Sequence, residues 1–368
     1  MKILITGSDG FIGKNLRAEM KNRNYKNVFL CNRQTKREQL VEYLKNSDII
    51  VHLAGVNRPE KTEQFNLDNV QFTEFIVDEL KKCKSKAKII FASSIQAELD
   101  NLYGRSKRES EKCLMSYSKD MDVPIKIMRY PNIFGKWCKP NYNSVVATFC
   151  YNIARDLPIK ISDEKRNLKL VYIDDVVDKI IYDIENNIWD ELFEDINPVY
   201  NISIGSLANL IYKIKNEKTE LSVPNLSNGL EKKIYSTYLS YLPLDSFSYN
   251  LKMNVDERGS FTELIRSNFA GQVSVNITKP GITKGKHWHH TKTERFIVVK
   301  GEALIKFKNI MTNETVNYEV NDKRLEVVNI PPGYVHSITN IGKDNLITVM
   351  WANEIFNKEK PDTFAEEI

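Results

Sequence analysis

The sequence predicts a doubly wound α/β sheet in the first part of the chain and an all-β sandwich or barrel in the last part. Up to about Asn201, short β-branched runs alternate with longer amphipathic stretches, which is the pattern of a parallel sheet with helices on both faces. After about Ser246, short alternating strands are separated by turn signals such as Pro-Pro-Gly at 331–333, a pattern typical of an all-β domain. A length of 368 residues agrees with two or three domains, because one domain takes roughly 150 residues.

Short apolar runs are expected to form the strands of the parallel sheet, and the segments between them fit helices. The runs are KILIT (2–6), DIIVHLAG (48–55), KIIFASS (88–94), IKIMRY (125–130) and LKLVYI (168–173). A helix at about 36–46 takes up most of the chain between Arg33 and Ile49. One strand of the usual set is therefore expected to be missing or very short.

The segment between the two expected domains has no clear period. Residues 222–247 mix Pro, Ser, Asn and Tyr, a composition that favours a linker or irregular structure. We place the boundary near Pro243 and expect one domain at 1–243 and a second at 244–368.

The composition excludes several classes of protein. With 42% hydrophobic and 27% charged residues, the chain reads as an ordinary globular protein. The net charge of +5 is too small for a nucleic-acid-binding protein and suits a polyanionic small molecule such as a nucleotide. No membrane span or signal peptide is recognisable, so we expect a cytoplasmic protein. The five cysteines have no CxxC spacing and are expected to be small buried hydrophobes.

A glycine-rich loop, GSDGFIG (7–13), leads from the first expected strand into a helix. Glycines at these places permit a tight turn, close approach of a pyrophosphate to the backbone, and close packing of helix on strand. The start of the helix adds N–H donors and a positive dipole end. The loop therefore predicts a Rossmann-type dinucleotide site, with cofactor contacts from Gly7, Gly10, Phe11, Ile12 and Gly13.

The residue after the second expected strand indicates which cofactor is bound. NAD enzymes place a carboxylate there for the ribose 2′-hydroxyl, whereas this chain has Asn32 and Arg33. Arg33 is suited to a 2′-phosphate, although a simple surface charge is the alternative reading. We expect NADPH.

A second element of the same site is Tyr103-x-x-x-Lys107 in an expected helix. Four-residue spacing puts both side chains on one face of the helix. There the ammonium can lower the pKa of the phenol, which can exchange a proton with a carbonyl or alkoxide during hydride transfer.

These motifs resemble the extended short-chain dehydrogenase/reductase family of nucleotide-sugar enzymes. The resemblance rests on TGSDGFIG (6–13), HLAG (52–55), the serines of FASS (91–94), YGRSK (103–107), MRYPNIFG (128–135) and VYIDDV (171–176). It implies that Ser94 polarises a sugar carbonyl, Tyr103 donates the proton, and Lys107 tunes Tyr103 and holds the nicotinamide ribose. Leu53, Ala54 and Gly55 of HLAG are implied as further cofactor contacts.

The last part of the chain carries a histidine-rich motif. On a strand, His287 and His289 lie on one face and His290 on the other. Together with Glu294 and His336 they form a set suited to Zn²⁺, Fe²⁺ or Mn²⁺ with an open position for substrate. We expect zinc, held by His287, His289, Glu294 and His336.

This spacing resembles the cupin superfamily, which implies a jelly-roll barrel. Gly281-x₅-His287-x-His289-x₄-Glu294-x₆-Gly301 matches its first motif and Pro331-x-Gly333-x₂-His336-x₃-Asn340 most of its second. Within cupins, DERGSFTEL (256–264) and GITKGKHWH (281–289) are similar to deoxysugar-nucleotide 3,5-epimerases. Their catalytic histidine falls on His287, so His287 is either ligand or base, with His290 as the reserve ligand.

The fusion of these two domains resembles bifunctional enzymes of bacterial capsular polysaccharide synthesis. The resemblance implies a UDP-linked 4-keto-6-deoxy-N-acetylhexosamine whose C3 is inverted by the cupin. The reductase then reduces C4 with NADPH to UDP-2-acetamido-2,6-dideoxy-L-talose, on the route to UDP-N-acetyl-L-fucosamine. A homodimer is implied as well. The alternatives are a reductase whose cupin only binds sugar nucleotide or builds the dimer, and a redox-neutral 4-epimerase or dehydratase.

Overall fold

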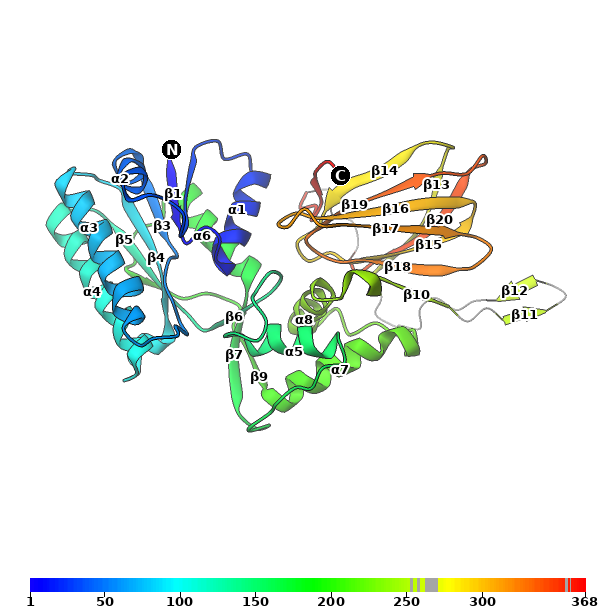
Figure 1. Cartoon of the computed structure of the whole chain (residues 1–368), viewed down its shortest axis with the longest axis horizontal. Coiled ribbons are helices and arrows are strands. Elements are labelled where there is room, and N and C mark those ends of the chain that lie inside the picture. The colour runs from blue at the N-terminus through cyan, green and yellow to red at the C-terminus, as the bar shows by residue number, and fades with distance from the viewer. Residues whose placement is uncertain (252–253, 257–258, 262–270, 355–356, 358) are drawn as a thin grey trace. The chain divides into compact units, whose positions relative to one another are not determined.

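A computed structural model shows the chain as two compact units (Figure 1). Unit 1 comprises Met1–Ser144 and Leu168–Asn201, and unit 2 comprises Val145–Asn167 and Ile202–Ile368. The structure describes residues 1–251, 254–256, 259–261, 271–354, 357 and 359–368. Five residues of the epimerase-like motif at 256–264, namely 257–258 and 262–264, lie outside this range.

Unit 1 is built on a six-stranded parallel sheet, as the sequence predicts. Its order is β2-β1-β3-β4-β5-β8. Its strands are β1 (Ile3–Thr6), β2 (Val28–Cys31), β3 (Ile49–His52), β4 (Lys88–Ser94), β5 (Ile125–Tyr130) and β8 (Phe193–Glu194). The strands β1 and β3 are buried at every position, because helices cover both faces of such a sheet. The sheet ends at β2 on one side, and α2 (Arg37–Asn46) leads directly into β3. The strand expected to be missing or very short in this part of the chain is absent from the described structure.

One expected strand lies in another sheet. The run LKLVYI forms β7 (Asn167–Tyr172), which pairs with β6 (Asn132–Phe134) in a separate three-stranded sheet completed by β9 (Tyr200–Ser203). The prediction that LKLVYI belongs to the main sheet was wrong. The short strand β8 occupies the position beside β5 instead, because apolar content alone does not specify which strand a segment pairs with.

Helices lie on both faces of the main sheet of unit 1 (Figure 1). The helices of this unit are α1 (Phe11–Asn22), α2 (Arg37–Asn46), α3 (Phe72–Lys82), α4 (Leu102–Met121) and α6 (Ile173–Glu185), with short helices at Asn66–Gln71 and Ile95–Glu98. One face packs Leu44, Ile76, Leu80 and Leu114 of α2, α3 and α4 against strand residues such as Ile89. This buried layer fixes the carboxyl ends of the strands, where the functional residues of unit 1 lie.

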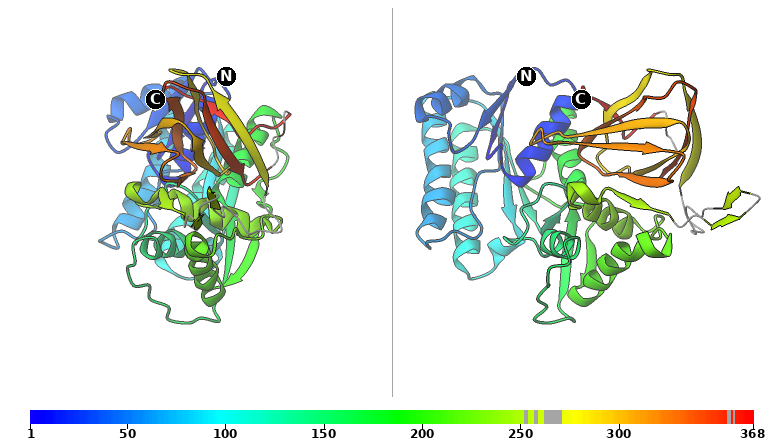
Figure 2. Two further views of the ribbon diagram at one scale, coloured as in Figure 1. Left: turned by 90° about the vertical axis from the view of Figure 1, so that its right-hand side faces the viewer. Right: turned by 45° about the vertical axis from the view of Figure 1, so that its right-hand side comes forward.

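Unit 2 contains two antiparallel five-stranded sheets, which form the sandwich that the sequence predicts (Figure 2). One has the order β10-β18-β15-β20-β13 and the other β17-β16-β19-β14-β21, and a separate hairpin pairs β11 with β12. The strands of the first sheet are β10 (Ser248–Asn250), β13 (Gln272–Thr278), β15 (Glu294–Lys300), β18 (Glu326–Ile330) and β20 (Leu346–Ala352). Those of the second sheet and the hairpin are β14 (Thr283–Trp288), β16 (Glu302–Asn309), β17 (Thr315–Asn321), β19 (Tyr334–Asn340), β21 (Phe364–Ala365), β11 (Asn254–Asp256) and β12 (Gly259–Phe261).

The described part of unit 2 has three helices, α5 (Val145–Ile153), α7 (Ile204–Glu220) and α8 (Gly229–Ser240), followed by a short turn of helix at Leu244–Ser246. Arg295 of β15 donates to Glu217 of α7 at 2.9 Å and to the Tyr235 hydroxyl of α8 at 3.0 Å. All three side chains are buried, so both helices are held against the barrel. The boundary expected near Pro243 stays a prediction.

Two further expectations concern the whole described chain. All five cysteines are free; Cys31, Cys138 and Cys150 are buried, and Cys83 and Cys113 are half-buried. Among the described residues, no helix has both the length and the apolar character needed to cross a membrane.

Candidate functional site

The glycine loop of unit 1 is a tight turn between β1 and α1. Gly7 has φ +65°, and a Cβ there would lie 2.7 Å from the backbone nitrogen of Ala54. A Cβ on Gly13 would lie 2.4 Å from the Gly7 carbonyl oxygen. Gly10 is the N-cap of α1, which begins at Phe11 and continues through Ile12. The loop therefore has the shape needed for a pyrophosphate at a helix N-terminus, and these residues fit a dinucleotide.

The HLAG segment packs beside this loop at the end of β3. The Thr6 hydroxyl accepts from the backbone N–H groups of Leu53 and Ala54, both at 3.2 Å. At Gly55 a Cβ would lie 2.8 Å from Asn69 Oδ1 and 3.3 Å from Lys107 Nζ. The segment thus connects the glycine loop with the expected catalytic lysine.

Arg33 is exposed just beyond the end of β2, the position that the cofactor prediction requires. Its neighbour Asn32 donates to the Asp9 carboxylate at 2.7 Å, and Arg17 donates to the other oxygen of Asp9 at 2.5 Å. Sequence reasoning missed this carboxylate in the loop. Arg17 and Asn32 occupy both of its oxygens, which leaves the Arg33 guanidinium as a separate cation near the end of β2.

Tyr103 and Ser94 come together at the carboxyl end of the sheet. Ser94 ends β4, and Tyr103 lies in the first turn of α4. Burial raises the pKa of the Tyr103 phenol to about 12, while a hydrogen bond with the Ser94 hydroxyl acts to lower it. This direction is opposite to the lowering expected from the Tyr-x-x-x-Lys spacing, because burial is the largest influence on the pKa of this phenol. A phenol with a raised pKa stays protonated at neutral pH, as a proton donor must.

Lys107 is 5% exposed and one helical turn from Tyr103. Its ammonium donates to the carbonyl oxygen of Ala92 at 2.8 Å and lies 4.7 Å from the centroid of the Phe91 ring. Burial lowers the pKa of Lys107 to about 8, and the Glu111 carboxylate acts in the opposite direction. Lys107 is thus a fixed cation that titrates near physiological pH.

A buried carboxylate network behind Lys107 was not predicted. Glu111, one turn further along α4, accepts from Ser93 at 2.5 Å. It also accepts from Arg129 in a two-point contact, from Nε at 2.9 Å and Nη2 at 2.6 Å. The spacing of 103, 107 and 111 continues one helical face. That spacing was the signal that could have found Glu111.

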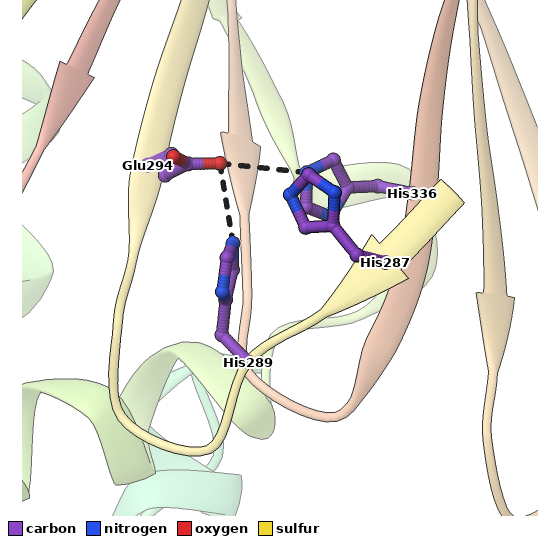
Figure 3. Close-up of side chains that lie close together, drawn as sticks. All are labelled: His287, His289, Glu294 and His336. Carbon is purple, nitrogen blue, oxygen red and sulfur yellow. Dashed lines mark hydrogen bonds and ion pairs between the residues drawn. The ribbon is translucent and has the colours of Figure 1, made fainter. Parts of the chain in front are cut away.

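The predicted metal ligands of unit 2 form one cluster, shown in Figure 3. One ligand atom from each of His287, His289, Glu294 and His336 lies within 4.8 Å of all the others. His287 and His336 are register partners in the β14–β19 pair, and their ring centroids are 4.6 Å apart. Glu294 begins β15, so the cluster joins the two sheets of the barrel.

The donor chemistry of the cluster fits a divalent cation. Burial lowers the pKa of His287 to about 4 and also lowers the pKa of His336. Burial alone would raise the pKa of Glu294, but His289 and His336 hold it well below the usual value. The Glu294 Oε2 atom lies 3.3 Å from His289 Nε2 and 3.4 Å from His336 Nε2. Three imidazoles and a carboxylate whose ligand atoms gather in this way suit a shared cation, which would replace the protons between them.

Two further side chains near the cluster, those of His290 and Lys292, differ in their contacts with it. His290, the reserve ligand, lies outside the four-residue cluster and packs edge-on against Trp288 and Phe364. The structure therefore brings His287 into the cluster and not His290. Lys292, which sequence reasoning missed, places its ammonium 3.0 Å from Glu294 Oε1. Its proximity in sequence to Glu294 was the available signal.

Two family models match the chain. The model described as "NAD dependent epimerase/dehydratase family" matches residues 3–202. The model described as "Polysaccharide biosynthesis C-terminal domain" matches residues 254–364. The first match covers the glycine loop and the Tyr103–Lys107 pair, and the second covers the four-residue cluster.

Individual relatives cover the same two regions. UDP-2-acetamido-2,6-beta-L-arabino-hexul-4-ose reductase of Pseudomonas aeruginosa is 43% identical over 99% of this chain and 98% of its own length. The crystal structure of the capsular polysaccharide assembling protein CapF of Staphylococcus aureus is 47% identical, with a TM-score of 0.69 and full coverage of both chains. The spore coat polysaccharide biosynthesis protein SpsL of Bacillus subtilis is 25% identical over 30% of this chain and 81% of its own length. With both of its parts matched in this way, the chain belongs to the NAD-dependent epimerase/dehydratase family and is a CapF-like member of it with a polysaccharide biosynthesis C-terminal domain.

Proposed function

We propose that this chain is a bifunctional nucleotide-sugar enzyme of capsular polysaccharide synthesis. Unit 2 inverts C3 of a UDP-linked 4-keto-6-deoxy-N-acetylhexosamine, and unit 1 then reduces C4 with NADPH to UDP-2-acetamido-2,6-dideoxy-L-talose, on the route to UDP-N-acetyl-L-fucosamine. The observation that carries the proposal is the similarity, over 99% of the chain, to the reductase of a UDP-linked 4-keto sugar. Further support comes from the two clusters of polar residues, one in each unit, because each offers the kinds of group that one of the steps needs.

In the reduction, the glycine loop would hold NADPH, which would supply the hydride for C4. Ser94 holds the carbonyl oxygen, and the Tyr103 phenol gives its proton to that oxygen as the carbonyl bond becomes an alcohol. Lys107, fixed by Ala92, holds the nicotinamide ribose and stabilises the phenolate that remains on Tyr103. Arg33 supports NADPH over NADH because a guanidinium can pair with a 2′-phosphate at two points.

In the inversion, a metal ion would be held by His287, His289, Glu294 and His336 and would supply positive charge beside the reacting carbons. The order of the two steps follows from chemistry. A ketone at C4 makes the proton on C3 acidic, so exchange at C3 must come before the ketone is reduced. Zinc is the proposed ion, because three imidazoles and one carboxylate are ligands that zinc accepts.

A homodimer and a cytoplasmic location are also part of the proposal. Support for the dimer comes from the edge strand β13, where Val273, Val275 and Ile277 are 60%, 65% and 58% exposed. Apolar side chains along an open sheet edge favour pairing with another chain. Light scattering of the purified protein measures this directly.

The test is incubation of the UDP-linked 4-keto sugar in D₂O, with and without NADPH, followed by NMR of the product. We expect deuterium at C3 in both reactions and a C4 alcohol only with NADPH, with one NADPH consumed per alcohol. Reduction without C3 exchange would leave a reductase whose barrel is a binding or dimerisation module. Conversion without consumption of NADPH would instead indicate a redox-neutral epimerase or dehydratase.

A further inference from the structure

We infer that Asp362 is a positioning residue for the metal centre of unit 2, acting on the turn that carries His289 and on the imidazole itself. The inference rests on the proposed metal centre. It concerns a residue that lies 68 positions beyond Glu294 and outside both histidine motifs.

The Asp362 carboxylate accepts hydrogen bonds from one turn, the segment that connects β14 with β15. Its Oδ1 accepts from the backbone N–H of His290 at 2.8 Å. Its Oδ2 accepts from the N–H groups of Thr291 and Lys292, both at 2.7 Å, and from the Thr291 hydroxyl at 2.9 Å. One carboxylate thus satisfies three consecutive backbone donors, an arrangement that fixes the course of the turn.

The backbone of Asp362 acts on the ligand itself. His289 Nδ1 lies 2.5 Å from the Asp362 carbonyl oxygen. Since a carbonyl can only accept, Nδ1 carries a proton, which leaves Nε2 as the ring atom that can bind a metal ion. That Nε2 faces Glu294 Oε2 at 3.3 Å, which is the direction of the proposed ion. Asp362 therefore selects the tautomer and the ring orientation that a metal ligand requires.

The residues that follow Asp362 are anchored to β14. Two residues further along the chain, β21 pairs with β14, so that Phe364 lies opposite Trp288 and Ala365 opposite His287. The N–H of Glu366 donates to the carbonyl of Lys286 at 3.0 Å. The segment that carries Asp362 is thus anchored to the same strand that supplies His287, and it links both sides of the cluster.

The same turn positions Glu294. Lys292, whose N–H is held by Asp362, places its ammonium 3.0 Å from Glu294 Oε1. The other carboxylate oxygen then remains directed at the two histidines. Loss of the Asp362 carboxylate should therefore disturb two of the four ligands at once, which a merely stabilising contact at the chain end would not do.

The experiment compares Asp362→Ala and the isosteric Asp362→Asn with the native chain. The matched control is Glu359→Ala, which removes an exposed carboxylate three residues away. Zinc affinity is measured by competition with a chelator, and ligand geometry by the visible spectrum of the Co²⁺-loaded protein. The ring nitrogen of His289 that carries the proton is identified by NMR of ¹⁵N-histidine-labelled, zinc-loaded protein. Reduction of the 4-keto sugar with NADPH reports the integrity of unit 1.

We expect Asp362→Ala to lower zinc affinity by about 10- to 100-fold and to change the Co²⁺ spectrum. Alanine keeps the backbone carbonyl, but without the carboxylate the turn and this carbonyl should shift apart, so His289 should no longer hold its proton on Nδ1 alone. Asp362→Asn should have a smaller effect of the same kind, and Glu359→Ala none. Native affinity and an unchanged spectrum in Asp362→Ala would overturn the inference. If both variants fail to fold, the native tautomer decides: a proton on Nε2 of His289 overturns it, and a proton on Nδ1 supports it. A native chain that binds no metal would contradict the proposed metal centre itself. That result is distinct from the outcomes that test the role of Asp362.

Discussion

In unit 1 the expected catalytic groups lie on one helix and the end of one strand, whereas in unit 2 the four candidate ligands come from three strands and a turn of two facing sheets. Tyr103, Lys107 and Glu111 follow one another at four-residue spacing on α4, so the helix itself brings them together. His287 meets His336 only because β14 and β19 pair in one register. A shift of that register by one residue would turn one imidazole to the opposite face of the sheet.

The two sites should respond differently to substitutions, because different contacts hold their residues in place. The unit 1 site depends on local geometry and on burial, which raises the pKa of Tyr103 and lowers that of Lys107. The unit 2 site depends on contacts between segments far apart in the sequence, including Asp362 on the turn at 290–292. We therefore expect single substitutions to separate the two activities cleanly.

The largest effect is expected for Tyr103→Phe. Loss of the proton donor should lower reduction by about 10²- to 10⁴-fold, while exchange at C3 remains at the native rate, because its groups belong to unit 2. Reduction is followed by NADPH absorbance and exchange by NMR in D₂O. Loss of both activities in a folded variant would mean that the two steps share one site.

Removal of a metal ligand should abolish C3 exchange and leave reduction intact, the reverse of the result expected for Tyr103→Phe. His289→Ala is expected to lose bound zinc and C3 exchange and to keep NADPH-dependent reduction. The variant should also lose the stabilisation that zinc gives the native chain, about 2.7 kcal/mol at a zinc concentration 100 times the Kd. Metal analysis, exchange and thermal unfolding with and without zinc measure these effects.

The control for this variant is His290→Ala, whose imidazole packs against Trp288 and Phe364 outside the cluster. It should retain zinc. If His289→Ala loses stability but keeps exchange, the ion is structural rather than catalytic. Full zinc content in His289→Ala would contradict its assignment as a ligand.

A smaller effect is expected for Arg33→Ala. Charge-assisted hydrogen bonds contribute about 1.5 to 3 kcal/mol, so kcat/KM for NADPH should fall by about 10- to 100-fold. The value for NADH serves as the internal control and should not change, because NADH has no 2′-phosphate. Equal use of the two cofactors by the native enzyme would refute the preference.

Much of both sites could be predicted because their residues stand in fixed local patterns. Gly7, Gly10 and Gly13 follow one strand, and His287, near the end of β14, stands two residues before His289 in the turn that follows it. The supporting groups could not be predicted in this way, because Arg129 reaches Glu111 and Asp362 reaches the β14–β15 turn only through tertiary contacts. The place of LKLVYI was missed for the same reason, since a buried apolar run does not identify its partner strand.

The smallest effect is expected for Glu111→Gln, which tests whether the groups behind Lys107 tune it. Burial lowers the pKa of Lys107 to about 8 and Glu111 opposes that shift. Without the carboxylate the pKa should fall further, so Lys107 loses its proton at a lower pH. If reduction requires the charged form, the rate falls as pH rises through this pKa, and that alkaline limb should move about one pH unit toward acid in the variant.

The matched control is Glu98→Gln, because Glu98 also pairs with Arg129, at 3.0 Å, but its side chain is 70% exposed. Its alkaline limb should coincide with that of the native enzyme. Since Glu111 is buried against Arg129, unfolding is measured alongside the pH profile, and rates are compared only where the variant is folded. An unshifted limb in folded Glu111→Gln would mean that the ionisation of Lys107 does not set the alkaline limit, and that this network supports α4 without acting on the reaction.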